Sequence, residues 1–394
     1  MLCDPTHQYP KGHNASRWAL PTFPIPSTGL ELMNNIMYKL ITDVNQVTPT
    51  WLTEVFRENG YLPQGQVVDV HPKPGPKAAS LIIPLEVRYS KDAPSSAPSR
   101  LILKMATSAL MGPSPKEIEF YKSIASKASN LPIIRCYQAV YSPDLGQFHL
   151  LLEDLSETHF PHPPSQLPPL KVYAEQIVDA LARLHAFWWD NPRLGKQVGK
   201  LPAETTTKGD MAAELEQWTR KTLSDFADFL GDRLSEERRK IYEHVINSLP
   251  SRLSTRFAAS NGLTLTHGDV HIGNFLYPQD PNHDTVRILD WKSWSIDIGA
   301  DDLAHMMAVF WFPERRSHLE QELLRRYYDH LLENGVTDYD WPACWYDYRL
   351  SVIRHLFYPM WQWSKGAPAD IWWNHLERVM LAFQDLRCVE LLDS

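Results

Sequence analysis

The sequence contains few of the residues that build metal clusters or disulfide frameworks. Its 394 residues include four cysteines, Cys3, Cys136, Cys344 and Cys388, which lie far apart and form no CxxC pair. This spacing argues against a zinc finger and against the dense disulfide framework of small secreted proteins. We therefore expect reduced thiols and a cytoplasmic location.

Long apolar runs and clustered positive charge are also missing. No stretch of about 18 uninterrupted apolar residues occurs, so no transmembrane helix is expected. The first residues lack a basic segment followed by an apolar one, so no secretory signal is expected either. The formal net charge is −8, and the densest basic runs, at residues 237–240 and 314–318, are short and contain acidic residues. Neither a nucleic acid nor a membrane is an expected partner, because nucleic-acid binding needs a basic stripe.

Apart from these absences, the composition is that of an ordinary globular protein. Hydrophobic residues make up 43% of the chain and charged residues 22%, so a chain of this length can bury a large core. Residues 1–28 show no periodicity and are expected to form an irregular arm. Helical spacing then predicts helices at residues 30–41 and 51–62, the second after the capping candidate Thr50.

Residues 66–155 alternate between strand-like segments and turns rich in Pro, Gly and Ser. Three successive strands with short connections predict an antiparallel sheet, which a helix and two more strands extend. The predicted strands are residues 66–72, 80–90, 100–106, 136–142 and 148–155, and the predicted helix is residues 115–126.

A proline-rich break at residues 160–170 separates these strands from a mostly helical remainder. One hairpin-like segment, residues 275–291, interrupts the helices. The expected fold class is therefore α+β, with a small β-rich lobe followed by a larger α-rich lobe and no internal repeat.

The segment LTHGDVHIGNFLY, residues 265–277, contains two His, an Asp and an Asn within eight positions. Phosphoryl transfer needs a carboxylate that accepts the proton of the attacking hydroxyl, oxygen ligands for Mg²⁺, and a lysine on the nucleotide phosphates. Asp269 and Asn274 stand five apart, as do the base and the metal-binding Asn of the H-R-D-x-x-x-x-N loop. Asp290 follows in VRILDW, where that pattern places a metal-binding Asp.

The partners of such a loop occur earlier in the chain and in the matching order. Lys104 ends a predicted strand, and Glu117 lies on the next helix, so the two can form the ion pair that steadies nucleotide phosphates. Glu119 lies on the same helix and is an open alternative to Glu117. Residues 71–80, where a phosphate-covering loop is expected, hold one Gly and three Pro instead of G-x-G-x-x-G.

Together these stretches resemble the aminoglycoside phosphotransferase and choline kinase superfamily, small-molecule kinases similar in fold to protein kinases. The likeness spans residues 60–310 and is greatest to the branch that includes ecdysteroid-kinase-like proteins. Only ten residues separate Asp290 from Asp301, so the long activation segment of a protein kinase is absent. The matching segments are LILK, KEIEFYKSI, HLLLEDL, LARLHAFWW, LTHGDVHIGNFLY, VRILDWKSW and GADDLAHMM.

The resemblance implies a role for each matching residue. Asp269 would be the catalytic base, Asn274 and Asp290 would hold Mg²⁺, and Lys104, paired with Glu117, would contact the phosphates of ATP. Asp302 would brace the catalytic loop. The remaining nucleotide-binding positions would be Leu152, Glu153 and Leu155 at the hinge between the lobes and Ser80 near the phosphates.

The implied division of the chain has four parts. An N-terminal arm and helix (1–45) precede a nucleotide-binding N-lobe (46–152), a hinge (153–158) and a C-lobe with the catalytic loop and acceptor cleft (159–394). The implied reaction is ATP- and Mg²⁺-dependent transfer of the γ-phosphoryl group to a hydroxyl of a small molecule. An amine or guanidine nitrogen is the lesser alternative as acceptor.

The acceptor is expected to be cationic or aromatic, because tryptophan is unusually frequent near the C-terminus. Most of these rings are expected to be packing residues, but some could form a wall that attracts a cation. Asp297 and Asp301 could add negative charge to that wall. The tryptophans concerned are Trp311, Trp341, Trp345, Trp361, Trp363, Trp372 and Trp373.

Two other interpretations compete with a kinase. His267, Asp269 and His271 could present ligands to Zn²⁺, although the two histidines are expected instead to hydrogen-bond the loop backbone, with His271 near the phosphates. The second is a catalytically silent nucleotide-binding or scaffold protein on the same fold, which the glycine-poor loop leaves open.

Overall fold

The computed structural model describes residues 40–74, 80–106, 115–127, 130–161, 169–203 and 209–393. Of the helix predicted over residues 30–41, only Leu40 and Ile41 fall in these ranges, and neither is helical. Half of the predicted phosphate-covering loop, residues 75–79, also lies outside them.

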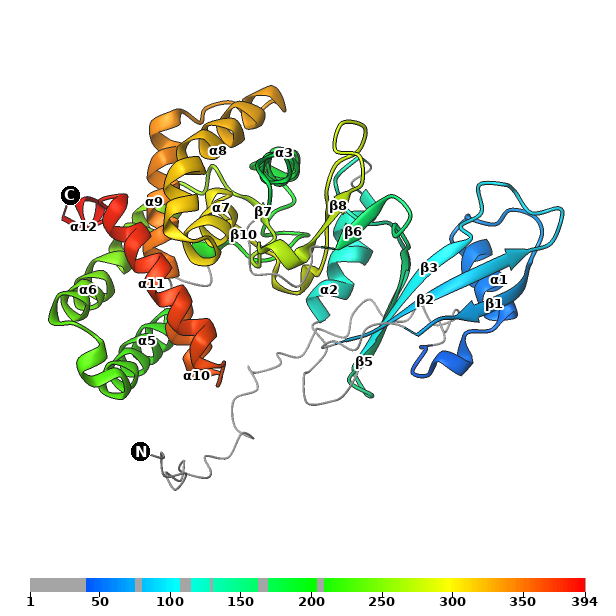
Figure 1. Cartoon of the computed structure of the whole chain (residues 1–394), viewed down its shortest axis with the longest axis horizontal. Helices are drawn as coiled ribbons and strands as arrows, with labels where there is room; N and C mark the ends of the chain where they lie inside the picture. The colour runs from blue at the N-terminus through cyan, green and yellow to red at the C-terminus, as the bar shows by residue number, and fades with distance from the viewer. Residues whose placement is uncertain are drawn as a thin grey trace, which may run out of the picture. The chain divides into compact units, whose positions relative to one another are not determined.

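Five antiparallel strands form one sheet in the order β1-β2-β3-β5-β4 (Figure 1). Their bounds agree with the predicted strands to within two residues at each end, so the predicted antiparallel meander is confirmed. The strands are β1 Val67–Pro72, β2 Ser80–Tyr89, β3 Arg100–Ala106, β4 Cys136–Ser142 and β5 Gln147–Glu153.

The two faces of this sheet pack against different helices. Leu101, Leu103 and Met105 of β3 lie in one core with helix α1 (Pro49–Glu58). Ile102 packs against a second core, which includes Phe120 just after helix α2 (Pro115–Glu119). Because successive side chains on a strand point to opposite faces, Lys104 shares the face of Ile102 and points toward α2.

Helix α1 begins earlier than its sequence signal indicated. The hydroxyl of Thr48 accepts a hydrogen bond from the Trp51 amide at 3.2 Å, and Pro49 is the first helical residue. The prediction that Thr50 caps the helix is therefore wrong. Proline lacks an amide hydrogen and has a φ suited to the first turn, so a helix can start at Pro49 without loss.

The helix predicted over residues 115–126 is present but changes its winding. Helix α2 continues as a π-helical turn, Phe120–Ile124, and then as a 3-10 turn, Ala125–Lys127. Phe120, Tyr121 and Ile124 are all buried. The wider turn is therefore compatible with burying all three side chains. The apolar spacing of the sequence did not predict this local change in winding.

The rest of the chain is mainly helical, as predicted. Three short 3-10 segments lie between the longer elements, at Gly231–Arg233, Ile272–Asn274 and Trp291–Ser293, and α7 continues as a π-helical segment, His305–Phe310. The helices are α3 Lys171–Trp188, α5 Gly209–Leu230, α6 Glu236–Ala258, α7 Ala300–Ala304, α8 Pro313–Glu333, α9 Trp341–His355, α10 Tyr358–Ser364, α11 Ala369–Asp385 and α12 Glu390–Asp393.

Two small sheets carry the polar loop between the helices. Strand β7 (Thr264–Thr266) pairs with β10 (Ser295–Asp297), and β8 (Phe275–Pro278) lies between β6 (His159–Pro161) and β9 (Arg287–Ile288). The pairing of β8 with β9 confirms the predicted hairpin-like segment. The loop itself, residues 267–274, joins β7 to β8.

A ring stack joins the π-helical turn after α2 to the turn after β9. The rings of Phe120 and Trp291 are nearly parallel, at an angle of 7°, and their centroids lie 3.8 Å apart. Because Trp291 follows Asp290 directly, this stack places Asp290 beside the helix that faces Lys104.

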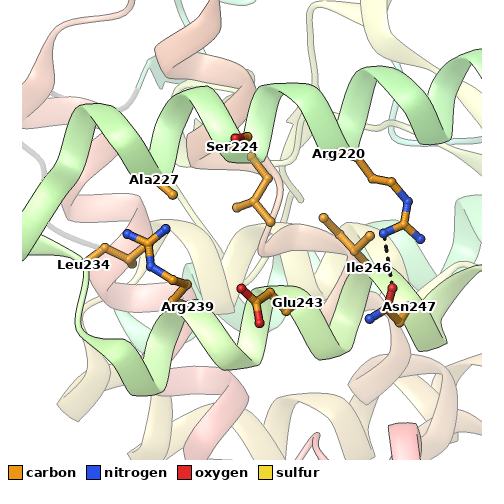
Figure 2. Close-up of a pocket in the computed structure, with 9 residues that line it drawn as sticks. Arg220, Ser224, Ala227, Leu234, Arg239, Glu243, Ile246 and Asn247 are labelled. Carbon is orange, nitrogen blue, oxygen red and sulfur yellow. Dashed lines mark hydrogen bonds between the residues drawn. The ribbon is translucent and has the colours of Figure 1, made fainter.

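Helices α5 and α6 run side by side with a cavity of about 250 Å³ between them, and at one end of it the Arg220 guanidinium donates to the Asn247 side chain (Figure 2). A larger cavity of about 710 Å³ is lined by residues between 186–190, 255–262 and 335–347. Neither contains a predicted site residue. Nowhere in the described ranges is a helix both long and apolar enough to span a lipid bilayer.

Candidate active site

One buried carboxylate holds the start of the polar loop. Asp302, on α7, accepts the backbone amide of His267 at 2.7 Å on one oxygen and that of Gly268 at 2.8 Å on the other. The ring of His185 lies 3.1 Å from the same carboxylate. Burial alone raises the pKa of Asp302, but these hydrogen bonds hold it below its ordinary value. The first two amides of the loop therefore donate to a carboxylate that stays negatively charged.

Only glycine fits at the second position of the loop. Gly268 has a φ of 74°, in the left-handed region, and a Cβ there would lie 2.5 Å from the carbonyl oxygen of Ser293. The backbone can therefore turn sharply between His267 and Asp269.

Asp269 and Asn274 are joined across the loop. The side-chain Nδ2 of Asn274 donates to the backbone carbonyl of Asp269 at 2.8 Å. The carbonyl of Asn274 in turn accepts the Leu289 amide at 2.9 Å, which brings the loop alongside Asp290. Since Nδ2 is used, the amide oxygen of Asn274 is the atom suited to a cation.

The two loop histidines bond the backbone rather than a shared centre. His267 accepts the Asp269 amide on Nδ1, so its Nε2 carries the hydrogen and donates to the Leu289 carbonyl at 2.7 Å. His271 accepts the Gly273 amide on Nδ1, and burial lowers its pKa despite the nearby Asp269. Among the residues that the structure describes, no three His, Cys, Asp or Glu side chains are placed to hold a metal. With both nitrogens of His267 in use, the zinc alternative has no support in this geometry.

Asp290 lies between two ammonium groups. Its Oδ1 is 3.1 Å from Nζ of Lys104, and its Oδ2 is 2.7 Å from Nζ of Lys292. Burial alone would raise the pKa of Asp290, but the two lysines lower it to about 2. The residue has a left-handed backbone, with a φ of 59°, and the 3-10 turn Trp291–Ser293 follows it directly.

Lys104 also pairs with the helix beside it. Its ammonium lies 2.8 Å from both carboxylate oxygens of Glu117, and both side chains are nearly buried. Burial lowers the pKa of Lys104, but Glu117 and Asp290 outweigh that effect and raise it. Glu119 is exposed on the same helix, so the structure selects Glu117 from the two alternatives.

The oxygens gathered here fit a hard divalent cation. Carboxylate and amide oxygens are the ligands that Mg²⁺ accepts, usually one or two from the protein beside water and phosphate oxygens. The Asp290 carboxylate and the Asn274 amide oxygen supply this donor set next to a lysine that can neutralise phosphate charge.

The predicted hinge residues lie at the end of β5. Leu152 is buried and Leu155 is partly buried, and the amide of Glu153 donates to the Arg135 carbonyl at 2.9 Å. Ser80 opens β2, but its side chain lies outside the described part of the chain.

Two of the predicted acceptor residues, Asp297 and Asp301, share one arginine. Arg354 binds Asp297 through two hydrogen bonds of 2.9 and 2.6 Å and lies 3.2 Å from Asp301. Both carboxylates therefore contact one arginine, which offsets one of the two negative charges and which the sequence analysis missed. Trp311 is 1% exposed and belongs to the core, not to a surface that a ligand can reach.

A different set of rings lies beside Asp269. The ring of Phe310 lies 5.4 Å from His271 and 4.7 Å from His375, measured between centroids. Tyr358 packs on His305 at 4.9 Å, and burial together with the charge of Asp269 raises the pKa of Tyr358. No local motif marks these rings, since they come from separate segments of the helical lobe.

Comparison with protein families gives one match. Residues 75–336, two thirds of the chain, match the profile of the ecdysteroid kinase-like family. No curated protein matches the sequence.

Comparison with solved structures finds matches of low sequence identity. A candidate aminoglycoside phosphotransferase from Ralstonia eutropha JMP134 has a TM-score of 0.52 and 15% identity, covering 85% of this chain and 97% of that one. Choline kinase LicA from Streptococcus pneumoniae has a TM-score of 0.43 and 14% identity, covering 80% and 94%. A choline/ethanolamine kinase family protein from Mesorhizobium loti has a TM-score of 0.43 and 15% identity, covering 82% and 88%. The first of these likenesses confirms the predicted α+β, kinase-like fold.

Proposed function

The chain belongs to the ecdysteroid kinase-like family, and from this premise we propose that it transfers the γ-phosphoryl group of ATP, with Mg²⁺, to a hydroxyl of a small molecule. One observation carries the proposal. The ammonium of Lys104 contacts both Glu117 and Asp290, which are far apart in sequence, at distances of 2.8 and 3.1 Å. A lysine so placed, next to oxygen ligands, is the arrangement that phosphoryl transfer requires.

Each residue then has a defined task. Asp269 accepts the proton of the acceptor hydroxyl as its oxygen attacks phosphorus. Asn274 and Asp290 hold the cation, and Lys104 binds the nucleotide phosphates while Glu117 keeps its side chain in place. Bound Mg²⁺ supplies charge neutralisation for the phosphate oxygens.

The nucleotide base is assigned to the end of β5. Because the amide of Glu153 is already bonded to Arg135, its carbonyl and the amide of Leu155 are the groups assigned to the adenine edge. The side chain of Leu152 would pack against the ring.

We assign the acceptor to the uncharged small molecules that carry an aromatic or apolar group next to the hydroxyl. Arg354 contacts both Asp297 and Asp301 and offsets part of their negative charge, which favours the aromatic over the cationic alternative. Phe310 and Tyr358 offer ring surface near Asp269. A cytoplasmic location is part of the proposal and is supported by the free thiols of Cys136, Cys344 and Cys388.

The first test is a thermal-shift series with ATP, GTP and ADP, each with and without Mg²⁺. A ligand that binds only the folded state raises the unfolding temperature by mass action. We expect ATP to stabilise the wild type in a Mg²⁺-dependent way and Asp290→Ala to lose that dependence. Asp280→Asn, an exposed change on the β8–β9 connection, is the matched control. Absence of any nucleotide effect on the wild type would reject the proposal.

A second test separates a kinase from a silent nucleotide-binding protein. Wild-type protein is incubated with ATP, Mg²⁺ and a panel of alcohols, and ADP formation is followed. Transfer to any alcohol that depends on Asp269 supports the kinase, whereas tight nucleotide binding without turnover across the panel supports the silent protein.

A further inference from the structure

Lys292 lies between the two aspartates of the site and has no role in the assignments above. Its ammonium is 2.7 Å from Oδ2 of Asp290 and 3.8 Å from Oδ2 of Asp269. It therefore contacts both the proposed cation ligand and the proposed base.

The fold sets this position through the turn after β9. Asp290 has a left-handed backbone, and the short 3-10 helix Trp291–Ser293 follows it directly. Trp291 is fully buried in its stack on Phe120. With that ring fixed, the next side chain, Lys292, is directed back over Asp290.

The two lysines on Asp290 are not equivalent. Lys104 is 12% exposed, bonds both oxygens of Glu117, and covers Oδ1 of Asp290. Lys292 is 47% exposed and covers Oδ2. A cation that needs one oxygen of Asp290 will therefore displace the more exposed Lys292, because moving Lys104 would leave the buried Glu117 carboxylate without its counter-ion.

We propose that Lys292 is an internal counter-ion that occupies the cation side of Asp290 before ligands bind and then moves to the γ-phosphoryl group. This inference rests on the proposed function, since it needs a nucleotide and a divalent cation at Asp290. After displacement the ammonium remains next to Asp269, where the acceptor hydroxyl and the transferring phosphorus meet.

The transfer itself remains balanced without a proton from Lys292. The acceptor oxygen forms a bond to the γ-phosphorus, the bond from that phosphorus to the bridging oxygen of ADP breaks, and the hydroxyl proton passes to Asp269. Lys292 stays protonated and donates hydrogen bonds to the γ-phosphoryl oxygens, whose negative charge it partly neutralises.

Two binding measurements test this without turnover. The variants are Lys292→Met, which removes the charge, and Lys292→Arg, which keeps it. Lys221→Met is the control, because Lys221 is another exposed lysine paired with an aspartate, at 2.5 Å from Asp225 on α5. The first measurement is the Mg²⁺ concentration that gives half of the thermal shift with ADP. The second is the preference for a non-hydrolysable β,γ-imido ATP analogue over ADP at saturating Mg²⁺.

For Lys292→Met we expect the half-saturating Mg²⁺ concentration to fall roughly twofold to fivefold, because the Lys292 ammonium no longer competes with the cation for Asp290 and the partly exposed ion pair is weak. The preference for the triphosphate analogue should fall roughly tenfold, because a charged donor to the γ-phosphate is lost. Lys292→Arg should keep that preference, and Lys221→Met should match the wild type in both measurements.

The outcomes distinguish the inference from the function on which it rests. A wild type that responds to Mg²⁺ and nucleotide, with Lys292→Met unchanged in either measurement, overturns the counter-ion role alone. A wild type with no Mg²⁺-dependent nucleotide binding overturns the proposed function and this inference together.

Discussion

The backbone amide of His267 donates a 2.7 Å hydrogen bond to Asp302, a fully buried carboxylate 35 positions later in the chain. The other carboxylate oxygen accepts the Gly268 amide at 2.8 Å. The position of Asp269 is thus set by a residue outside its loop. Substitution of Asp302 should therefore lower the stability of the protein and disturb the geometry of the site.

Asp302→Asn should destabilise the protein on the order of 3 kcal/mol, as expected when one member of a buried charged network is removed. The new amide nitrogen cannot accept a backbone amide, so one of the two loop bonds is lost. The measurement is the unfolding transition in urea. Asp228→Asn, an exposed change on α5, should leave the transition in place. An Asp302→Asn transition that coincides with the wild type would show that the loop does not depend on this carboxylate.

Glu117→Gln should weaken Mg²⁺-dependent ATP binding and lower the unfolding temperature. The buried ammonium of Lys104 keeps Asp290 but loses the carboxylate that bonds it twice. Thermal shifts with and without Mg-ATP measure both effects. Glu119→Gln is the matched control on the same helix and should behave as the wild type. Equal effects of the two substitutions would contradict the assignment of Glu117 as the partner of Lys104.

Asp269→Asn should lower turnover by about 10² to 10⁴, the usual contribution of a positioned acid or base. The loop should keep its shape, because Asn274 bonds the backbone carbonyl of Asp269 and not its side chain. The nucleotide-induced thermal shift should therefore survive while ADP formation is lost. Turnover equal to the wild type would remove Asp269 from the role of base.

The sheet could be predicted from the sequence because its strands are short, largely apolar segments, although burial alternates along β3 and not along β4 or β5. In RLILKMA, successive residues from Leu101 to Met105 divide between two cores, and the turns between strands are rich in Pro, Gly and Ser. Local geometry was less readable. The cap at Thr48 and the π-helical turn at Phe120–Ile124 depend on packing and backbone conformation that apolar spacing does not report.

The candidate site was readable where spacing is short and chemical types are distinctive. Asp269, Asn274 and Asp290 lie within 22 residues, and the order of Lys104 and Glu117 follows one strand and one helix. The bond between Arg354 and Asp297 spans 57 residues and has no local signature, so the pairing of these aspartates with an arginine was missed. Lys292 could have been found from its position two residues after Asp290.

Acid should destabilise the protein through two buried histidines that fold in the neutral form. His149 accepts the Ile41 amide on one nitrogen and contacts Gln138 with the other, and burial lowers its pKa to about 4. Burial, aided by Arg378, lowers the pKa of His375 to about 3. Between pH 6.5 and these values the unfolded chain binds protons that the folded chain does not. Stability is therefore full above pH 6.5 and falls as the pH is lowered.

Each of these histidines contributes a slope of roughly 1.4 kcal/mol per pH unit near pH 5. Urea unfolding at pH 7.5, 6.0 and 5.0 measures the total slope. His149→Gln and His375→Gln should each flatten it by about that amount, because glutamine does not titrate. His318→Gln, an exposed change on α8, should leave the slope unchanged. If both buried substitutions keep the wild-type slope, the loss of stability in acid arises from other groups and the neutral state of these histidines is not what limits the fold.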